Sequence, residues 1–198
     1  MLYIATHNLK KFAEIEAILA PMPCQSAVGI QTDAPLELGL SFLENAIIKA
    51  RALSQITKTP VIADDSGLVV PSLNGAPGIY SARYAGIDAN DEKNINLLLK
   101  QFKDQPSLDN KAYFICVMVY LTHALDPCPI IAQGRLHGEI INDIRGEFGF
   151  GYDPVFYLAD KQKTLAELPA NIKNKISHRY HALQSLQQQL KQNDTHNN

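Results

Sequence analysis

Two adjacent aspartates, Asp64 and Asp65, lie between two apolar runs in the segment 61–70 (VIADDSGLVV). The apolar residues before them predict a buried strand that ends where the acidic pair begins. Ionised carboxylates are rarely fully buried unless they are paired or bind a metal. We therefore expect the pair at an edge of the core, where a metal ion or a reacting phosphate could bind. An acidic turn that only faces solvent is equally compatible with this segment alone.

Side chains of a strand alternate between its two faces, so Asp64 and Asp65 are not expected to face the same pocket. One would be the working carboxylate and the other a supporting group. With Glu37, which the sequence places in a loop, they supply the hard oxygen ligands that Mg²⁺ prefers, while water and substrate phosphates complete its coordination.

The turn Thr6-His7-Asn8 separates a short apolar strand, residues 2–5, from a helix with apolar residues at helical spacing. A helix amino terminus after a polar turn is suited to binding a phosphate group. Lys10 and Lys11 in the first turn are unfavourable for the helix dipole, and a bound anion would account for them. The alternative is ordinary capping by Asn8 with solvated lysines.

The segment 145–154 (RGEFGFGYDP) interleaves three glycines with Phe148, Phe150 and Tyr152. Glycine allows close backbone approach to a ligand, and aromatic rings offer flat faces for a base. A β-bulge is the structural alternative. Together with the acidic pair and the helix start, this segment is part of what a nucleoside triphosphate would require.

A basic segment that runs into the last helix contains Lys173, Lys175, His178 and Arg179. It offers a second basic group to a nucleoside triphosphate, although His178 and Arg179 could also be a solvated helix start. The chain contains neither a GxxxxGK[ST] phosphate loop nor an HExxH metal motif. Any nucleotide site must therefore be built from groups that are dispersed along the sequence.

The elements that must position these groups alternate between strand and helix, which predicts a single α/β domain over residues 1–198. Ser41 and Glu44 form a capping-box pattern, which gives Glu44 a structural role. Besides the strand that ends at the acidic pair, we expect strands at 28–32, 111–121 and 130–141, the last two as an antiparallel pair, helices at 41–56 and 91–102, and a disordered tail at 192–198.

The composition gives 18 basic against 20 acidic residues and a net charge of -2. This balance gives no reason to expect binding to nucleic acid or to an anionic membrane. Three scattered cysteines without a CxxC pair indicate reduced thiols and a cytoplasmic protein. The leading apolar run is too short for a signal peptide, and the longest apolar run, 113–121, is half a membrane span.

Six blocks in this order closely resemble the Ham1-type inosine/xanthosine triphosphate pyrophosphatases, a family of nucleotide house-cleaning enzymes, over nearly the whole chain. They are AT-x-N-x2-K at 5–11, SFLENAIIKAR at 41–51, IADDSGL at 62–68, GAPGIYSARYAG at 75–86, GFGYDP at 149–154 and SHR at 177–179. The resemblance implies an elongated α/β fold with a mixed sheet, flanking helices and two lobes around a central cleft, usually as a homodimer.

The resemblance also implies the reaction and the residues that perform it. Mg²⁺-dependent hydrolysis would convert ITP, dITP or XTP to the monophosphate and pyrophosphate. Glu37 and Asp65 would bind the metal, Asp65 would be the catalytic base and Asp64 would support it. Contacts to the nucleotide would come from Thr6, His7, Asn8, Lys10, Lys11 and Ser66, and Lys49 would add positive charge near the phosphates. The purine would be held by Phe150, Gly151, Tyr152, Asp153, Lys173, His178 and Arg179.

The chain departs from the family at one position, and two other functions are compatible with its residues. His7 replaces a glycine that is usual in the family, which adds a Cβ where close approach to phosphate is expected. A Maf-like pyrophosphatase acting on modified pyrimidine nucleotides is an alternative enzyme. A nucleotide sensor without hydrolytic activity is a further alternative, but it would not need the three carboxylates Glu37, Asp64 and Asp65.

Overall fold

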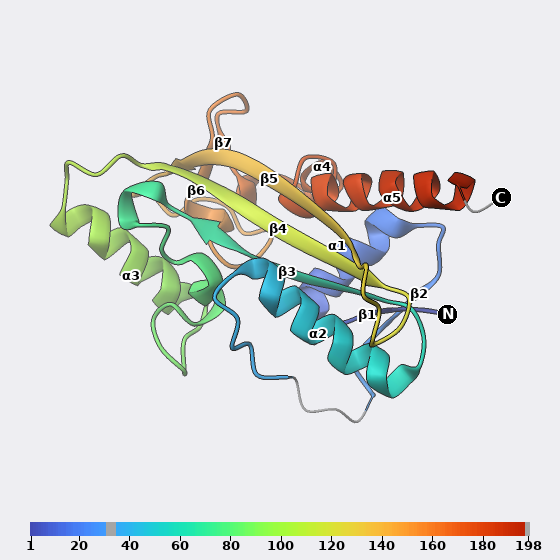
Figure 1. Cartoon of the computed structure of the whole chain (residues 1–198). Coiled ribbons are helices and arrows are strands. Elements are labelled where there is room, and N and C mark those ends of the chain that lie inside the picture. Colours follow the sequence, from blue (N-terminus) through green and yellow to red (C-terminus); the bar gives the residue numbers. More distant parts are fainter. Residues whose placement is uncertain (31–34, 197–198) are drawn as a thin grey trace. The chain divides into compact units, whose positions relative to one another are not determined.

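The computed structural model describes residues 1–30 and 35–196. Within them one mixed sheet has the strand order β2-β1-β3-β4-β5-β6-β7, shown in Figure 1. Its strands are β1 (Leu2–Ile4), β2 (Cys24–Ser26), β3 (Val61–Val69), β4 (Lys111–Leu121), β5 (Ile130–Ile140), β6 (Phe156–Leu158) and β7 (Lys163–Thr164). The α-helices are α1 (Leu9–Leu19), α2 (Phe42–Thr57), α3 (Asp91–Asp104), α4 (Ala170–Lys173) and α5 (His178–His196), and short 3-10 helices include Gly78–Arg83 and Leu165–Glu167.

The chain forms two compact units, each assembled from separate segments. Unit 1 comprises residues 1–65, 116–134 and 178–198, and unit 2 comprises residues 66–115 and 135–177. Three of the boundaries fall inside β3, β4 and β5, so each of these strands contributes residues to both units, and the fourth lies at the start of α5. The mixed sheet with flanking helices confirms the predicted α/β class.

Unit 1 packs helices against both faces of its strands. β1 pairs in parallel with β2 and β3, with Ile4 opposite Ser26 and Ile62. Ile62 belongs to one apolar cluster with residues of α1 and α5, whereas Val61 and Ala63 belong to another with residues of α2. The strand alternation therefore directs successive β3 side chains to different helices.

Unit 2 has its own apolar core. Leu98 and Phe102 of α3 pack with Phe114 of β4 and Phe156 of β6. The ring centroids of Phe114 and Phe156 are 4.7 Å apart. Asn90 caps α3 by accepting a hydrogen bond from the Lys93 amide.

Side-chain capping, which is a local sequence rule, begins α1, α2 and α3. Ser41 accepts a hydrogen bond from the Glu44 amide, as the capping pattern predicts, while the Glu44 carboxylate accepts from the Leu40 amide at 2.8 Å and from the Ser41 hydroxyl. The pattern at Thr164 and Glu167 also forms a capping box, but it opens only a 3-10 helix.

Three expectations from the sequence need correction. The strand expected at 28–32 lies instead at Cys24–Ser26, and residues 31 and 32 are outside the described residues. The segment 145–152 lies in no strand, so it is not a β-bulge. Helix α5 continues to His196, so residues 192–196, which we expected to be disordered, are helical. Within the described part of the chain, no helix is both long and apolar enough to cross a membrane.

Candidate active site

The acidic pair lies within a continuous strand rather than at its end. β3 runs from Val61 through Asp64, Asp65, Ser66 and Gly67 to Val69. Asp64 is 1% exposed and Asp65 is 6% exposed. The expected strand end and the alternative of a solvated acidic turn are therefore both wrong. The apolar residues on both sides of the acidic pair keep the strand continuous. The two carboxylates can be buried because basic and amide side chains of unit 1 contact them.

The two aspartates face different helices, as strand alternation predicts. The Asp64 carboxylate is 3.4 Å from the Lys11 ammonium of α1. The Asp65 carboxylate accepts from the Lys49 ammonium of α2 at 3.1 Å and from the Asn45 side-chain amide at 3.2 Å. Each carboxylate thus has its own basic partner in unit 1.

Lys49 joins Asp65 to Glu37. Its ammonium is 2.9 Å from a Glu37 oxygen and 3.1 Å from an Asp65 oxygen. Burial alone would lower the pKa of Lys49, but the charges of Asp64, Asp65 and Glu37 outweigh it and raise that pKa. Burial raises the pKa of Asp65 in spite of the Lys49 and Lys11 charges, and Glu37 adds to the increase. The three groups form one electrostatically coupled cluster.

This cluster has the donor chemistry that a divalent cation requires. No group of three or more His, Cys, Asp or Glu side chains within residues 1–30 and 35–196 is placed to hold a metal ion by itself. Mg²⁺, however, is usually bound by one or two carboxylates together with substrate phosphates and water. Glu37 and Asp65 are two such carboxylates, and the Lys49 ammonium between them shows that the position accommodates positive charge.

The amino terminus of α1 is capped by the side chain of Asn8, the residue that precedes the helix. Asn8 Oδ1 accepts from the amides of Lys10 and Lys11 at 3.0 and 3.1 Å. The Asn8 amide in turn donates to the Thr6 hydroxyl at 3.2 Å. The alternative of helix capping is therefore confirmed, and two amides that we expected to be open to phosphate are occupied. Lys11 also has an intramolecular partner in Asp64, so no bound anion is needed to explain it.

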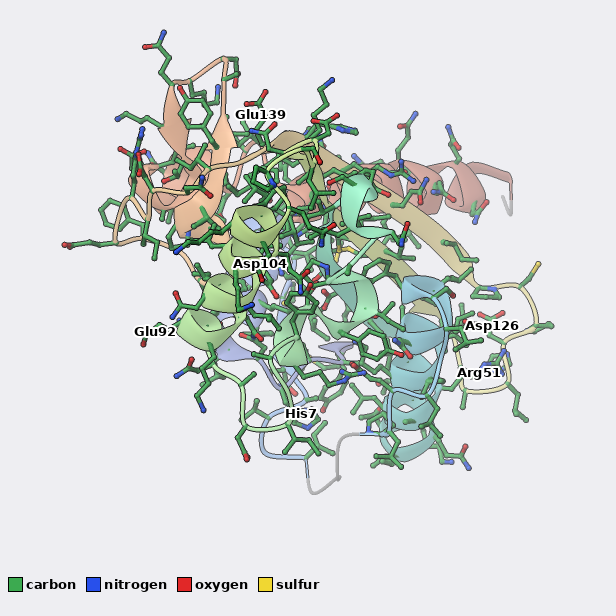
Figure 2. All side chains as sticks on the ribbon, turned by 90° about the vertical axis from the view of Figure 1, so that its left-hand side faces the viewer. His7, Arg51, Glu92, Asp104, Asp126 and Glu139 are labelled. Carbon is green, nitrogen blue, oxygen red and sulfur yellow. The ribbon has the colours of Figure 1, made fainter. Side chains whose placement is uncertain are left out.

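His7 lies on the loop between β1 and α1 and is exposed (Figure 2). Lys10 is exposed as well, whereas Thr6 is buried. Ser66 follows Asp65 in β3 and is half-buried.

The start of α5 contributes two buried polar side chains to unit 1. His178 and Arg179 are 3% and 4% exposed. The Arg179 guanidinium donates to the Glu14 carboxylate of α1 at 2.7 Å. The alternative of a solvated helix start is wrong, because the segment packs on α1 and both side chains lie in the interior.

Unit 2 contains a second group of predicted site residues, centred on Asp153. Its Oδ2 atom accepts from the Phe150 amide at 2.9 Å and lies 2.6 Å from the Lys173 ammonium. That ammonium is also 4.7 Å from the centroid of the Phe150 ring, a cation–π contact. Asp153 and Lys173 are each 3% exposed. The glycine-rich segment is thus held in shape by a buried ion pair.

Other contacts within unit 2 hold the same loop. The Tyr152 hydroxyl donates to the Ser81 carbonyl at 2.9 Å, and the Gly151 amide donates to the Asp91 carboxylate at 2.8 Å. Burial, with smaller effects of Tyr84 and Asp91, raises the pKa of Tyr152. Tyr152 is therefore a neutral, buried anchor of the loop.

Three residues in these groups were not identified from the sequence: Glu14, Asn45 and Asp91. Asn45 lies one helical turn before Lys49, so the i, i+4 spacing places it on the same face of α2. Its position within the predicted helix, next to the apolar residue Ala46, could have drawn attention to it. The pairings of Glu14 with Arg179 and of Asp91 with Gly151 span long sequence separations, and no local pattern predicts them.

Comparison with known proteins gives consistent matches. The family model described as Ham1 family matches residues 2–189. The dITP/XTP pyrophosphatase of Legionella pneumophila (strain Lens) is 57% identical over 185 residues, covering 92% of this chain and 94% of the relative. The dITP/XTP pyrophosphatase of Escherichia coli (strain K12) is 47% identical over 187 residues, with coverage of 92% and 94%. A solved structure of a HAM1 protein from Coxiella burnetii superposes with a TM-score of 0.89 at 40% identity, covering 96% of this chain and 98% of that one.

Proposed function

The chain belongs to the Ham1 family, and from this premise we propose that it removes deaminated purine nucleotides by a Mg²⁺-assisted attack of water on the α-phosphorus. Its reaction is the hydrolysis of ITP, dITP and XTP to the monophosphate and pyrophosphate, which agrees with the dITP/XTP pyrophosphatases that it resembles. The proposal adds the residues and the cofactor.

The contact that carries the proposal is the Lys49 ammonium held between Glu37 and Asp65. Asp65 accepts a proton from the attacking water, or orients that water, and is therefore the catalytic carboxylate. Water forms the new bond to the α-phosphorus, and the bond to the bridging oxygen of pyrophosphate breaks. Asp64 supports the arrangement by holding Lys11 from the other face of β3.

Glu37 and Asp65 are the residues that would bind Mg²⁺. When bound, this ion neutralises charge on the phosphate oxygens and on the departing pyrophosphate. Lys11 and Lys49 add fixed positive charge, and Thr6, His7, Asn8, Lys10 and Ser66 complete the proposed contacts to sugar and phosphates. His7 replaces the glycine that is usual in the family and presents an exposed imidazole there.

The proposed base-recognition groups are the loop residues Phe150, Gly151, Tyr152 and Asp153, together with Lys173, His178 and Arg179. Hydrogen-bond donors directed at a 6-keto oxygen favour hypoxanthine and xanthine. An adenine amino group would leave those donors unpaired or opposed by another donor. The Asp153–Lys173 pair supports this assignment because it keeps the loop and a cation together within unit 2.

A nucleotide panel tests the proposal. The enzyme is assayed with ITP, dITP, XTP, ATP, GTP and a modified pyrimidine triphosphate, with and without Mg²⁺, and pyrophosphate is scored separately from phosphate. We expect Mg²⁺-dependent pyrophosphate release from the first three substrates. Equal cleavage of ATP and GTP would remove the house-cleaning role, and preference for the modified pyrimidine would favour the Maf-like alternative.

We further propose that both units act as one catalytic domain, that the protein is a homodimer, and that it works in the cytoplasm on the nucleotide pool. The three free cysteines agree with a reducing compartment. Sedimentation equilibrium tests the dimer, since a monomeric mass at assay concentration would contradict it.

A further inference from the structure

Asn45 is buried between the two carboxylate-bearing parts of unit 1 and contacts both. It is 0% exposed. Its side-chain Oδ1 accepts from the Gly39 amide at 2.9 Å, and its Nδ2 donates to Asp65 at 3.2 Å. We propose that Asn45 is a positioning residue for the reaction: it orients the Asp65 carboxylate and fixes the loop that carries Glu37. This inference rests on the proposed function of Asp65.

The contacts determine the orientation of the Asn45 amide. The Gly39 backbone amide can only donate, so it must meet the Asn45 oxygen, and an ionised Asp65 can only accept, so it must meet the nitrogen. Rotation of the amide by 180° would break both hydrogen bonds. A side chain with one fixed orientation can transmit a fixed geometry from the loop to β3.

The loop approaches α2 closely enough that only glycine fits at position 39. A Cβ on Gly39 would lie 2.6 Å from Glu44 Cβ and 2.7 Å from Asn45 Oδ1. The backbone contact with Asn45 therefore depends on the missing side chain of Gly39. Because Glu37 is two residues earlier in the same loop, its distance from Asp65 is coupled to this contact.

Lys49, one turn further along α2, makes a parallel connection. It joins the same loop to the same aspartate through Glu37 and Asp65. Asn45 occupies one Asp65 oxygen and Lys49 the other. The lysine is charged and can exchange its partners when phosphate or metal binds, whereas the neutral amide has no such competitor. Asn45 is thus the contact suited to hold Asp65 throughout turnover.

A matched control lies in unit 2. Asn94 of α3 is 3% exposed, and its side chain also bridges two segments, accepting from the Ala85 amide at 2.8 Å and donating to the Ala82 carbonyl at 3.2 Å. It has the same burial and the same number of described side-chain contacts, but both of its partners are backbone groups. Asn94→Ala therefore measures what the loss of a buried bridging amide does when neither partner is Asp65 or the loop that carries Glu37.

The test compares Asn45→Ala, Asn45→Asp and Asn94→Ala. For each variant we would measure unfolding in urea, kcat and KM for ITP at saturating Mg²⁺, and the affinity for Mn²⁺ alone by electron paramagnetic resonance. Asn45→Asp is nearly isosteric, keeps an acceptor for Gly39 and loses the donor to Asp65. We expect kcat to fall about 10- to 100-fold in both Asn45 variants with a much smaller change in KM, and Mn²⁺ to bind Asn45→Ala about tenfold more weakly.

Gly39→Ala disturbs the same bridge from the loop side. If the bridge exists, the effects of Gly39→Ala and Asn45→Ala on kcat are non-additive in the double variant, because either change already breaks it. Fully additive effects would overturn the coupling to the loop.

The positioning role is overturned if folded Asn45→Ala and Asn45→Asp keep the kcat and Mn²⁺ affinity of Asn94→Ala. Failure of the proposed function looks different: the wild-type protein would not release pyrophosphate from ITP. In that case the Mn²⁺ measurement still decides whether Asn45 orients the carboxylate.

Discussion

At the scale of single residues, Asp65 is a buried carboxylate whose two oxygens are each held by a side chain of α2. The neighbouring Asp64 is held by α1. Because successive strand residues face opposite sides, one aspartate cannot replace the other without a change in strand register. The two adjacent carboxylates therefore have different consequences when they are removed.

Replacing the proposed catalytic carboxylate should abolish turnover without abolishing binding. For Asp65→Asn we expect kcat for ITP to fall by about 10²–10⁴, the usual contribution of a general base, while calorimetry still detects ITP binding. Asp104→Asn, at the exposed end of α3 in unit 2 (Figure 2), serves as the control and should keep wild-type turnover. Unchanged Mg²⁺-dependent pyrophosphate release by Asp65→Asn would refute the mechanism.

The Asp153–Lys173 pair should be important for stability as well as for the base-recognition loop. Lys173→Met leaves a buried carboxylate without its cation, and loss of one partner of such a pair costs about 3–5 kcal/mol. Adding Asp153→Asn to this variant removes the unpaired buried charge, so the double variant should recover part of the lost free energy of unfolding. Urea unfolding measures both.

An exposed ion pair provides the comparison for Lys173. Lys161 is 3.2 Å from Asp160, and both side chains are accessible to water. Lys161→Met should change the unfolding free energy by less than about 1 kcal/mol. Equal losses at Lys161 and Lys173 would contradict the importance given to burial.

At the scale of elements, the turn between β4 and β5 is held by an ionised aspartate. Asp126 accepts from the Thr122 amide and hydroxyl and from the Cys128 amide, and the Arg51 guanidinium of α2 donates to the Ala124 and Asp126 carbonyls (Figure 2). Burial would raise the pKa of Asp126, but the hydrogen bonds from Thr122 and Cys128, together with the charge of His123, outweigh it and lower the pKa below its ordinary value.

This lowered pKa predicts the sign of a pH effect. The folded protein favours the ionised form of Asp126, so its contribution to stability is present at neutral pH and is lost as the pH falls through the lowered pKa. We expect Asp126→Asn to be less stable than wild type at neutral pH, with the difference shrinking below about pH 4. Urea unfolding across this range measures it.

Leu125→Ala, at the exposed tip of the same turn, is a suitable control because it leaves the Asp126 contacts intact. Its stability should follow the pH dependence of the wild type. A constant difference between Asp126→Asn and wild type at all pH values would show that the carboxylate charge has no part in holding the turn.

Helix α5 packs on β5 at a position that only glycine permits. A Cβ on Gly134 would lie 2.3 Å from the His178 carbonyl and from the Ala182 amide, both backbone groups. Gly134→Ala must therefore displace the start of α5, and we expect a loss of about 1–3 kcal/mol or more in the unfolding free energy. ITP turnover should fall with it, because His178 and Arg179, which we propose to hold the purine, begin this helix.

Gln133→Ala, at an exposed position beside Gly134 in β5, should alter neither property much. If Gly134→Ala unfolds at the wild-type urea concentration and keeps its kcat, the backbone contact does not constrain α5.

The sequence predicted these elements well where the information is local. Capping at Ser41 and the length of β4 both follow from short patterns. The strand through Asp64 and Asp65 could not be predicted as continuous, because its burial depends on Lys11, Asn45 and Lys49, which come from other elements.

The members of the site were found from the sequence more readily than their contacts. Motif blocks identified Asp153 and Lys173, but their ion pair joins residues far apart in the chain, and nothing in either block specifies it. The strand expected at 28–32 was misplaced because Cys24 to Ser26 has a weaker apolar pattern than the segment that follows it.

At the scale of the whole molecule, the proposed nucleotide contacts belong to both units. Hydrogen exchange with an uncleavable ITP analogue should therefore protect segments 6–11 and 37–49 of unit 1 and segment 149–153 of unit 2. The corresponding ATP analogue should protect segment 149–153 much less, because its base lacks the 6-keto acceptor. Equal protection of 149–153 by both analogues would contradict the assignment of base recognition to that loop.

The discontinuous make-up of unit 1 has a consequence for how the protein is made. The apolar cluster that joins β3 to α1 and α5 contains Ala182, Leu183 and Leu186 of α5 together with Ile4 and Ile62. During synthesis from the amino terminus, the early segments cannot complete this core until residues 178–186 have left the ribosome. Unit 2, which comprises residues 66–115 and 135–177, has all its residues earlier. A chain released prematurely after residue 177 would lack both Arg179 and the helix that closes the core, so incomplete products should be inactive and readily degraded.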